Sequence, residues 1–200
     1  MKKFLLLIIL LSSYTIPVFS NDYLFQGSAV FNWDTISQEE RDDDIEHIKK
    51  NIFTENTVVK IEDFKTKYKD YLKDKNYKTH YLVAAAGYKE YKNYNISAMY
   101  LKKLSTLYIY ALQPKDNPTV IFYYDTLGNL RYVDNIKGNY PNFPYYTEQY
   151  KRNGKLVAVN YFTSKDTQYI FNDEQEFKGV WNQYKFYDLN GKVKMRRSNY

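Results

Sequence analysis

The spacing of apolar residues changes once along this chain, near residues 113–118. Before that point, apolar side chains recur every three or four residues, which is typical of amphipathic helices. After it, β-branched and aromatic runs alternate with glycine-containing turns, which is typical of antiparallel strands. The break itself reads QPKDNP, and its two prolines end a helix. The pattern predicts an α+β fold, with N-terminal helical hairpins over about 35–113 and a C-terminal antiparallel β-meander over about 118–199.

The first predicted helix has a defined start. Ser37 is followed three residues later by Glu40, a capping-box pattern in which each side chain bonds the other residue's backbone N–H. We expect this helix to reach about Phe53 and to bury Ile45, Ile48 and Ile52. A second helix is predicted over 60–74, with these apolar residues on one face: Ile61, Phe64, Tyr68, Tyr71 and Leu72.

A helical hairpin is predicted over about 78–111. Ala84, Ala85 and Ser97 are small enough to let two antiparallel helices approach closely. Larger residues would fill the groove between them: Tyr81, Tyr88, Tyr94, Leu101, Leu104 and Tyr108. On these residues the segment resembles one tetratricopeptide-type hairpin, with the closing proline of that repeat displaced to Pro114. A generic helical hairpin explains the same spacing.

Three segments of the β-region, 124–130, 150–156 and 187–193, share one form. Each has Tyr, three residues, Gly, then Asn or Lys, and finally Leu or Val. Glycine accepts the positive φ of a tight turn, so the Tyr should end one strand and the aliphatic residue should begin the next. The segments resemble the hairpin units of bacterial YD-repeat and MORN-like proteins over about 119–199. That resemblance implies a protein that binds, scaffolds or neutralises a partner.

The N-terminal residues predict export. Lys2 and Lys3 precede an unbroken apolar run over 4–11, and Val18 and Ser20 suit a cleavage site before Asn21. The run is too short for a membrane-spanning helix, and we expect no transmembrane segment in the mature chain. We therefore divide the chain into a signal peptide (1–20), a helical region (21–117) and a β-hairpin region (118–200), located in the periplasm or outside the cell.

The sequence contains no cysteine, so neither disulfides nor a lipid-anchored cysteine are expected. Tyrosine is common, with 24 residues, which fits either codon bias in an AT-rich genome or an aromatic binding surface. Basic residues outnumber acidic ones, 29 to 23, but the excess gathers near the C-terminus, so we do not expect nucleic acid as a partner.

The C-terminal basic residues alternate with apolar ones. In a strand, Val193 and Met195 would face the core while Lys192, Lys194 and Arg196 form a basic row in solvent. Such a row either protects a sheet edge from association or contacts an anionic envelope polymer or lipid headgroup. Both interpretations stay open at this point.

Motifs for catalysis and cofactor binding are missing from the sequence. It has no Gly-x-Ser-x-Gly elbow, phosphate-binding glycine loop or His-Glu-x-x-His helix. His47 and His80 fall on different predicted helices, so no metal site is assigned, and no cofactor is expected. A glycosidase would need two facing carboxylates. The candidates by composition are Glu148, Asp166, Asp173, Glu174 and Glu176.

One aromatic segment, YPNFPYY over 140–146, has two prolines that limit its flexibility. It is either a preformed aromatic shelf for a glycan or peptide, or a loop that plugs one edge of the sheet. Trp181 allows the same two interpretations: its side chain either contacts a ligand or packs in the core. The candidate binding surface comprises Tyr140, Phe143, Tyr145, Tyr146, Trp181, Lys192, Lys194 and Arg196.

These features favour an exported, non-enzymatic protein that binds or scaffolds an envelope polymer or a protein partner. One alternative is a hydrolase that acts on an envelope glycan through a carboxylate pair. Another is a purely structural module.

The predicted cleavage can be tested on the exported protein. Because the residues before Asn21 have the features of a signal peptide, intact-mass analysis should show Asn21 at the N-terminus. Exported chains that keep Met1 would contradict this prediction.

Overall fold

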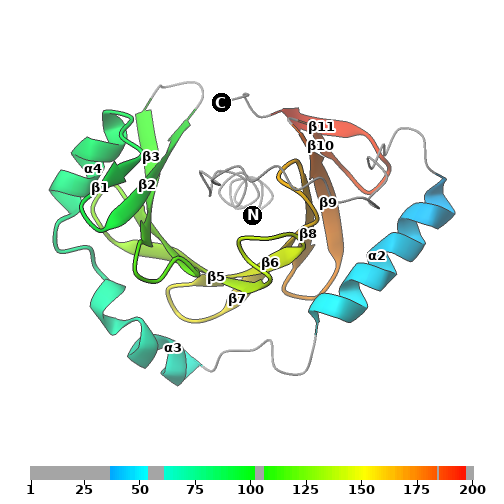
Figure 1. The fold of residues 1–200 in the computed structure, drawn as a ribbon, viewed down its shortest axis with the longest axis horizontal. Coiled ribbons are helices and arrows are strands. Elements are labelled where there is room, and N and C mark those ends of the chain that lie inside the picture. Colours follow the sequence, from blue (N-terminus) through cyan, green and yellow to red (C-terminus); the bar gives the residue numbers. More distant parts are fainter. Residues whose placement is uncertain (1–36, 54–60, 102–105, 184, 197–200) are drawn as a thin grey trace. The chain divides into compact units, whose positions relative to one another are not determined.

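The computed structural model describes residues 37–53, 61–101, 106–183 and 185–196. Eleven strands form one antiparallel sheet, in which each strand neighbours the next along the chain (Figure 1). Together with the helices, this confirms the mixed α+β class. The elements are α2 (Gln38–Ile52), α3 (Ile61–Lys67), η1 (Lys69–Tyr71), α4 (Tyr77–Ala85), β1 (Glu90–Tyr91), β2 (Tyr94–Leu101), β3 (Thr106–Pro114), β4 (Val120–Asp125), β5 (Leu130–Gly138), β6 (Tyr145–Lys151), β7 (Leu156–Phe162), β8 (Thr167–Asn172), β9 (Phe177–Asn182), β10 (Lys185–Tyr187) and β11 (Val193–Arg196).

Helix α2 begins with the predicted capping box. The Glu40 N–H donates to the Ser37 hydroxyl at 3.2 Å, and the Ser37 N–H donates to the Glu40 carboxylate at 2.8 Å. The hydrogen bond from the Ser37 N–H lowers the pKa of Glu40, because it stabilises the charged carboxylate. Ile48 and Ile52 are buried as predicted, whereas Ile45 is only partly buried.

The helix predicted over 60–74 is shorter than expected. α3 ends at Lys67, and the single 3-10 turn η1 follows it. Phe64 and Tyr68 are buried, in agreement with the predicted apolar face. The predicted signal peptide and Leu104 lie outside the described residues.

The tetratricopeptide-like hairpin predicted over 78–111 is wrong. Its first helix corresponds to α4, but residues 94–101 and 106–114 form the paired strands β2 and β3 instead of a second helix. The four-residue spacing of Ser97 and Leu101 explains the error. Four residues are close to one helical turn, but four is also an even number, so the same spacing puts two side chains on one face of a strand.

The described residues form two compact units. Unit 1 contains 61–136 and 148–157, and unit 2 contains 37–53, 137–147 and 158–196, apart from the gaps given above. The boundary predicted near residue 117 falls inside unit 1, between β3 and β4.

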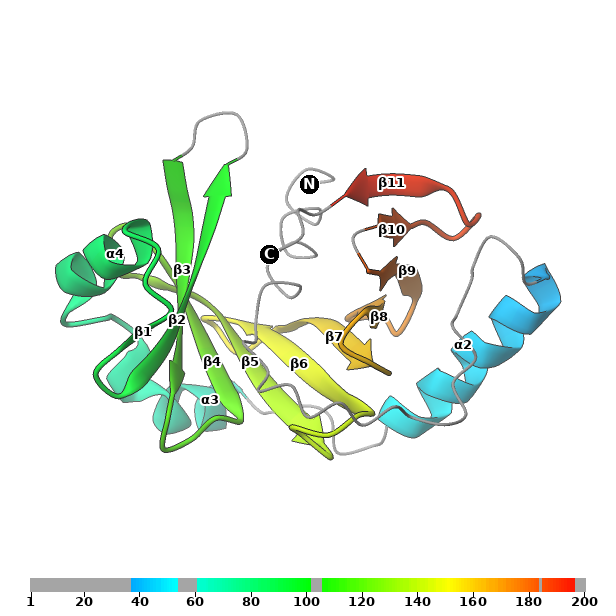
Figure 2. The same cartoon turned by 45° about the horizontal axis from the view of Figure 1, so that its top comes forward.

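Unit 1 packs its helices on one face of its strands. α4 lies against β2 and β3 (Figure 2), and the Tyr71 ring of η1 stacks on Phe122 of β4 with centroids 3.9 Å apart. Aromatic residues supply much of this core. Its buried members are Phe64, Tyr68, Ala84, Ile96, Leu107, Tyr110, Leu112, Val120, Phe122, Tyr124, Leu130, Val133 and Tyr150.

Unit 2 has its own aromatic core. Phe53, at the end of α2, meets Phe171 of β8 edge to face with centroids 5.6 Å apart. Trp181 of β9 is fully buried and packs against Phe186 of β10 at 5.4 Å. The rings of α2, β8, β9 and β10 therefore join the helix to the strands of this unit.

One hairpin turn occurs four times, at 125–129, 151–155, 172–176 and 188–192. In each turn the first residue donates its N–H to the carbonyl four residues later and accepts from the N–H three residues later, at 2.8–3.1 Å. The fourth residue has positive φ, as expected for a type I turn followed by a bulge. These residues are Gly128 (74°), Gly154 (84°), Gln175 (62°) and Gly191 (70°).

The sequence predicted three of these turns and missed the third in chain order. Its fourth residue, Gln175, is not a glycine, so the glycine pattern does not include it. In the missed turn and in two of the predicted turns, the side chain of the first residue accepts hydrogen bonds from the backbone of the turn. Asp125, Asn172 and Asp188 each accept two N–H groups through Oδ1, at 2.8–3.1 Å.

Gly128 and Gly87 form a matched pair for a stability test. Both have positive φ, 74° and 79°, so alanine is strained at either position. A Cβ on Gly128 would lie 2.3 Å from the Tyr77 Cβ, whereas nothing lies within 4 Å of a Cβ on Gly87. We expect Gly128→Ala to lower the free energy of unfolding by at least about 1 kcal/mol more than Gly87→Ala, measured by chemical denaturation. Equal losses would mean that Tyr77 does not pack on this turn.

Candidate functional site

An aromatic cluster in unit 2 is the best candidate for a binding site. We call Tyr140 and Phe143 in the β5–β6 connection, Tyr145 at the start of β6 and Phe162 at the end of β7 the aromatic shelf. The Tyr145 ring stacks on Phe162 at 4.8 Å, Phe143 stacks on Tyr145 at 5.2 Å, and Tyr140 meets Tyr145 edge to face at 5.3 Å. Tyr145 and Phe162 are buried, while Tyr140 and Phe143 are partly exposed. Two partly exposed rings therefore pack on the buried Tyr145, which itself stacks on the buried Phe162.

Strand register explains why the shelf is anchored. Phe162 lies opposite Gln168, Gln168 opposite Trp181, and Trp181 opposite Phe186, so these four side chains form one row across β7 to β10. Burial of the shelf's inner ring, together with the neighbouring Tyr140, raises the pKa of Tyr145, so its hydroxyl stays neutral. The shelf is thus the partly exposed end of a buried row.

The position of the loop differs from the predicted plug at a sheet edge. β5 and β6 are interior strands of the sheet, so their connection lies at strand ends and not beside an edge strand. Pro141 and Asn142 at the tip are exposed, and Tyr146 is partly buried. The loop leaves the Tyr140 and Phe143 rings partly exposed while they pack on Tyr145, which suits noncovalent contact with a flat apolar surface.

The other predicted surface residues do not join the shelf as exposed groups. Trp181 is buried in the row described above. Lys192 and Lys194 are exposed, and the Lys194 ammonium pairs with the Asp188 carboxylate at 3.1 Å. Arg196 lies in β11, and only its backbone is described.

Val193 corrects the expected alternation of β11. It was predicted to face the core, but it is 41% exposed. Among the described strands, β11 pairs with β10 alone and ends the sheet, so its side chains are covered on fewer sides than those of an interior strand. The predicted arrangement, with basic residues in solvent and Val193 in the core, therefore does not hold at Val193.

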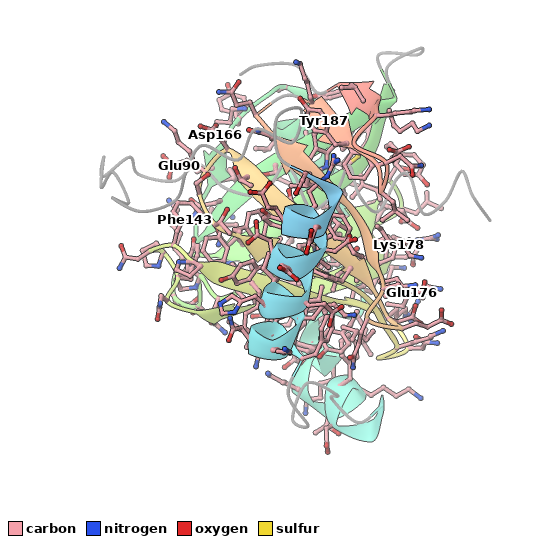
Figure 3. All side chains as sticks on the ribbon, turned by 90° about the vertical axis from the view of Figure 1, so that its right-hand side faces the viewer. Glu90, Phe143, Asp166, Glu176, Lys178 and Tyr187 are labelled. Carbon is pink, nitrogen blue, oxygen red and sulfur yellow. The ribbon has the colours of Figure 1, made fainter. Side chains whose placement is uncertain are left out.

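Of the carboxylates considered for a hydrolase, Asp173, Glu174 and Glu176 share the turn between β8 and β9, whereas Asp166 and Glu148 lie elsewhere. Asp166 precedes β8 and Asp173 follows it, so a six-residue strand of roughly 20 Å separates them. Glycosidase pairs lie at most about 9.5 Å apart. Figure 3 likewise shows Asp166 and Glu176 well apart. Glu176 pairs with Lys178 at 2.5 Å, and Glu148 is buried with the Tyr150 hydroxyl donating to it at 2.8 Å.

Sequence reasoning missed a buried polar cluster in unit 1. The Asp74 carboxylate lies 2.5 Å from His80 Nδ1 and accepts the Tyr110 hydroxyl at 3.0 Å and the Asn76 N–H at 2.9 Å. Asp74 and His80 are both buried. Burial and the neighbouring Asp74 charge raise the pKa of Tyr110. The carboxylate has several donors within the core, so the cluster joins the start of α4 to β3.

A second buried carboxylate in unit 1 has only neutral partners among the described hydrogen bonds. Asp134 of β5 is 0% exposed and accepts the Tyr123 hydroxyl at 2.9 Å and the Gln149 side-chain N–H at 2.8 Å. Burial raises the pKa of Asp134 to about 7, although both hydrogen bonds favour the charged form. In the sequence, only the presence of an aspartate within the strand segment LRYVDNIKG pointed to this buried carboxylate.

Among the described residues, no group of three or more potential ligand side chains is arranged to hold a metal ion. No described helix is long and apolar enough to cross a bilayer. Comparisons with protein-family models, curated proteins and solved structures found no match. Function must therefore be inferred from the geometry of the molecule itself.

The raised pKa of Asp134 predicts a pH-dependent stability. The folded protein keeps a proton on Asp134 up to about pH 7, whereas the unfolded chain releases it near 3.8. Stability from this group is therefore fully present at low pH and falls as pH rises toward 7, by at most about 1.4 kcal/mol per pH unit. Relative to wild type, Asp134→Asn should gain stability as the pH rises from about 4 to about 7 and show a constant difference above that, in denaturant titrations.

Asp188→Asn is the matched control for this titration. Partial burial raises the pKa of Asp188, but hydrogen bonds from the Lys192 N–H, Lys194 and the Asn190 N–H outweigh that effect and lower it. Its carboxylate is charged throughout this pH range, so the difference from wild type should stay constant. A constant difference for Asp134→Asn as well would show that Asp134 titrates normally.

Proposed function

We propose that this protein is exported and acts by binding an envelope glycan on the aromatic shelf, without catalysing a reaction. The two partly exposed rings, Tyr140 and Phe143, held on the buried Tyr145, are the observation that carries this proposal. Pyranose rings present flat faces of C–H groups, and these pack well on aromatic rings. The N-terminal signal-peptide pattern supports a location in the periplasm or outside the cell.

Preorganisation is the physical advantage of the shelf. A free aromatic side chain loses rotamer freedom when it binds, and that loss opposes association. Here the Tyr140 and Phe143 rings already contact Tyr145, and Tyr145 is fixed by Phe162. Binding would therefore order few additional groups.

Binding can be measured by co-sedimentation of the purified exported protein with insoluble peptidoglycan. We expect Tyr140→Ala and Phe143→Ala each to weaken association about tenfold, as for an aromatic contact at the centre of an interface. Tyr88→Ala is the control, because the Tyr88 ring is 65% exposed but belongs to unit 1. Thermal denaturation should show that all three variants are folded.

The same samples distinguish binding from hydrolysis. We expect no soluble glycan fragments to be released over long incubation. Fragment release that disappears on changing Asp166 or Glu176 would replace the binding proposal with the hydrolase. Co-sedimentation that is unaffected by both shelf variants would remove the shelf as the contact.

A further inference from the structure

The exposed side of α4 forms a surface that nothing else in the described fold covers. The exposed residues Lys78, Leu82 and Ala85 follow each other at four- and three-residue spacing, so they line one stripe along the helix, and the exposed Lys75 lies in the turn just before its N-cap. Leu82 is 65% exposed, although leucine usually lies inside a fold. The opposite side of the helix carries the buried His80 and Ala84.

Two exposed tyrosines lie near the C-terminal end of α4. Gly87 has positive φ and ends the helix, with the Gly87 N–H bonded to the Ala84 carbonyl and the Tyr88 N–H to the Val83 carbonyl. These bonds fix the backbone of Tyr88, whose ring is 65% exposed. The Tyr100 hydroxyl donates to the Ala84 carbonyl at 3.1 Å, and Tyr100 is 40% exposed.

We call Lys75, Lys78, Leu82, Tyr88 and Tyr100 the α4 surface. It gathers three of the large exposed apolar side chains, whereas Leu127, Leu189 and Val193 belong to hairpin turns or the β11 edge. Scattered exposed apolar residues are normal, but a group rimmed by polar residues marks an interaction site.

The charge around this surface indicates the kind of partner. Residues 73–92 contain five lysines and two carboxylates, while the preceding residues 61–72 contain three of each sign. One of the two carboxylates, Asp74, is buried against His80, and the other, Glu90, pairs with Lys115 at 2.5 Å. The exposed charge beside Leu82 and Tyr88 is therefore positive, which favours an anionic partner.

The size of the surface favours a lipid layer over a folded protein. α4 has nine residues, a length of roughly 14 Å. A stable protein interface needs about 800 Å² on each partner, more than one short helix supplies. A membrane surface needs no matching shape. Leucine and tyrosine can enter the headgroup region while lysines reach lipid phosphates. We propose that the α4 surface docks on a bilayer containing anionic phospholipids.

Vesicle co-sedimentation tests this directly, with the processed protein purified from the exported fraction. The wild-type protein should bind vesicles of mixed phosphatidylglycerol and phosphatidylcholine and should dissociate from them at high salt. It should not bind vesicles of pure phosphatidylcholine. Lys75→Gln and Lys78→Gln should each weaken binding roughly fivefold. Leu82→Ser combined with Tyr88→Ser should reduce it further at unchanged thermal stability, because both side chains are exposed.

Two control variants locate the contact. Leu189→Ser changes a leucine that is 51% exposed beside the C-terminal basic residues, and Phe143→Ala changes the aromatic shelf. Both should bind vesicles like wild type. The proposal is wrong if wild type does not bind anionic vesicles, binds neutral ones equally, or loses binding through Leu189→Ser while the α4 variants keep it. Because the vesicles contain no glycan, failure here is independent of the shelf.

Discussion

A buried tyrosine must find a partner for its hydroxyl, and this constraint shapes unit 1. An unpaired buried hydroxyl costs about 1–3 kcal/mol, so a core rich in tyrosine must also bury acceptors. Four of the resulting pairs join the helical segment to strands or one strand to another: Tyr68 with Asn135, Tyr110 with Asp74, Tyr123 with Asp134, and Tyr124 with the Tyr71 carbonyl. The fifth pair, Tyr150 with Glu148, lies within β6. The buried carboxylates are thus consequences of the tyrosines around them.

This view explains why buried acids in unit 1 need not be catalytic. The Asp74 carboxylate accepts the Asn76 N–H and the Tyr110 hydroxyl and lies 2.5 Å from His80 Nδ1, so its removal would leave the Tyr110 hydroxyl without that acceptor inside the core. Asp134 differs because its two partners are neutral, and burial keeps it protonated up to about pH 7. A carboxyl group in a β-strand core is therefore part of the packing here, although its titration remains visible in stability.

Local signals predicted the parts of the fold that depend on neighbouring residues. The Ser37–Glu40 capping box and the three glycine turns involve contacts within five residues, so a short stretch of sequence was enough to define them. The third turn was missed because Gln175 adopts a conformation usually left to glycine. β2 and β3 were taken for a helix because a four-residue spacing fits both periods and their pairing is not local.

The candidate site shows the same limit. The aromatic loop was visible from its prolines and rings, but its anchor Phe162 lies on the next strand and is reached only through the register of the sheet. The α4 surface was hidden for a different reason: Tyr88 was predicted to fill the groove of a helical hairpin, and no described helix covers it. Exposure became evident only when residues 94–101 proved to be a strand.

The distribution of tyrosine also bears on the choice between codon bias and a binding surface. A biased codon supply raises the number of tyrosines but does not decide where each ring lies. Tyr110, Tyr123 and Tyr124 are buried with bonded hydroxyls, as core packing requires. Tyr140 is instead partly exposed and meets Tyr145 edge to face, and Tyr88, in the other unit, is 65% exposed. Core packing does not account for these exposed rings, and they are the tyrosines for which we propose binding roles.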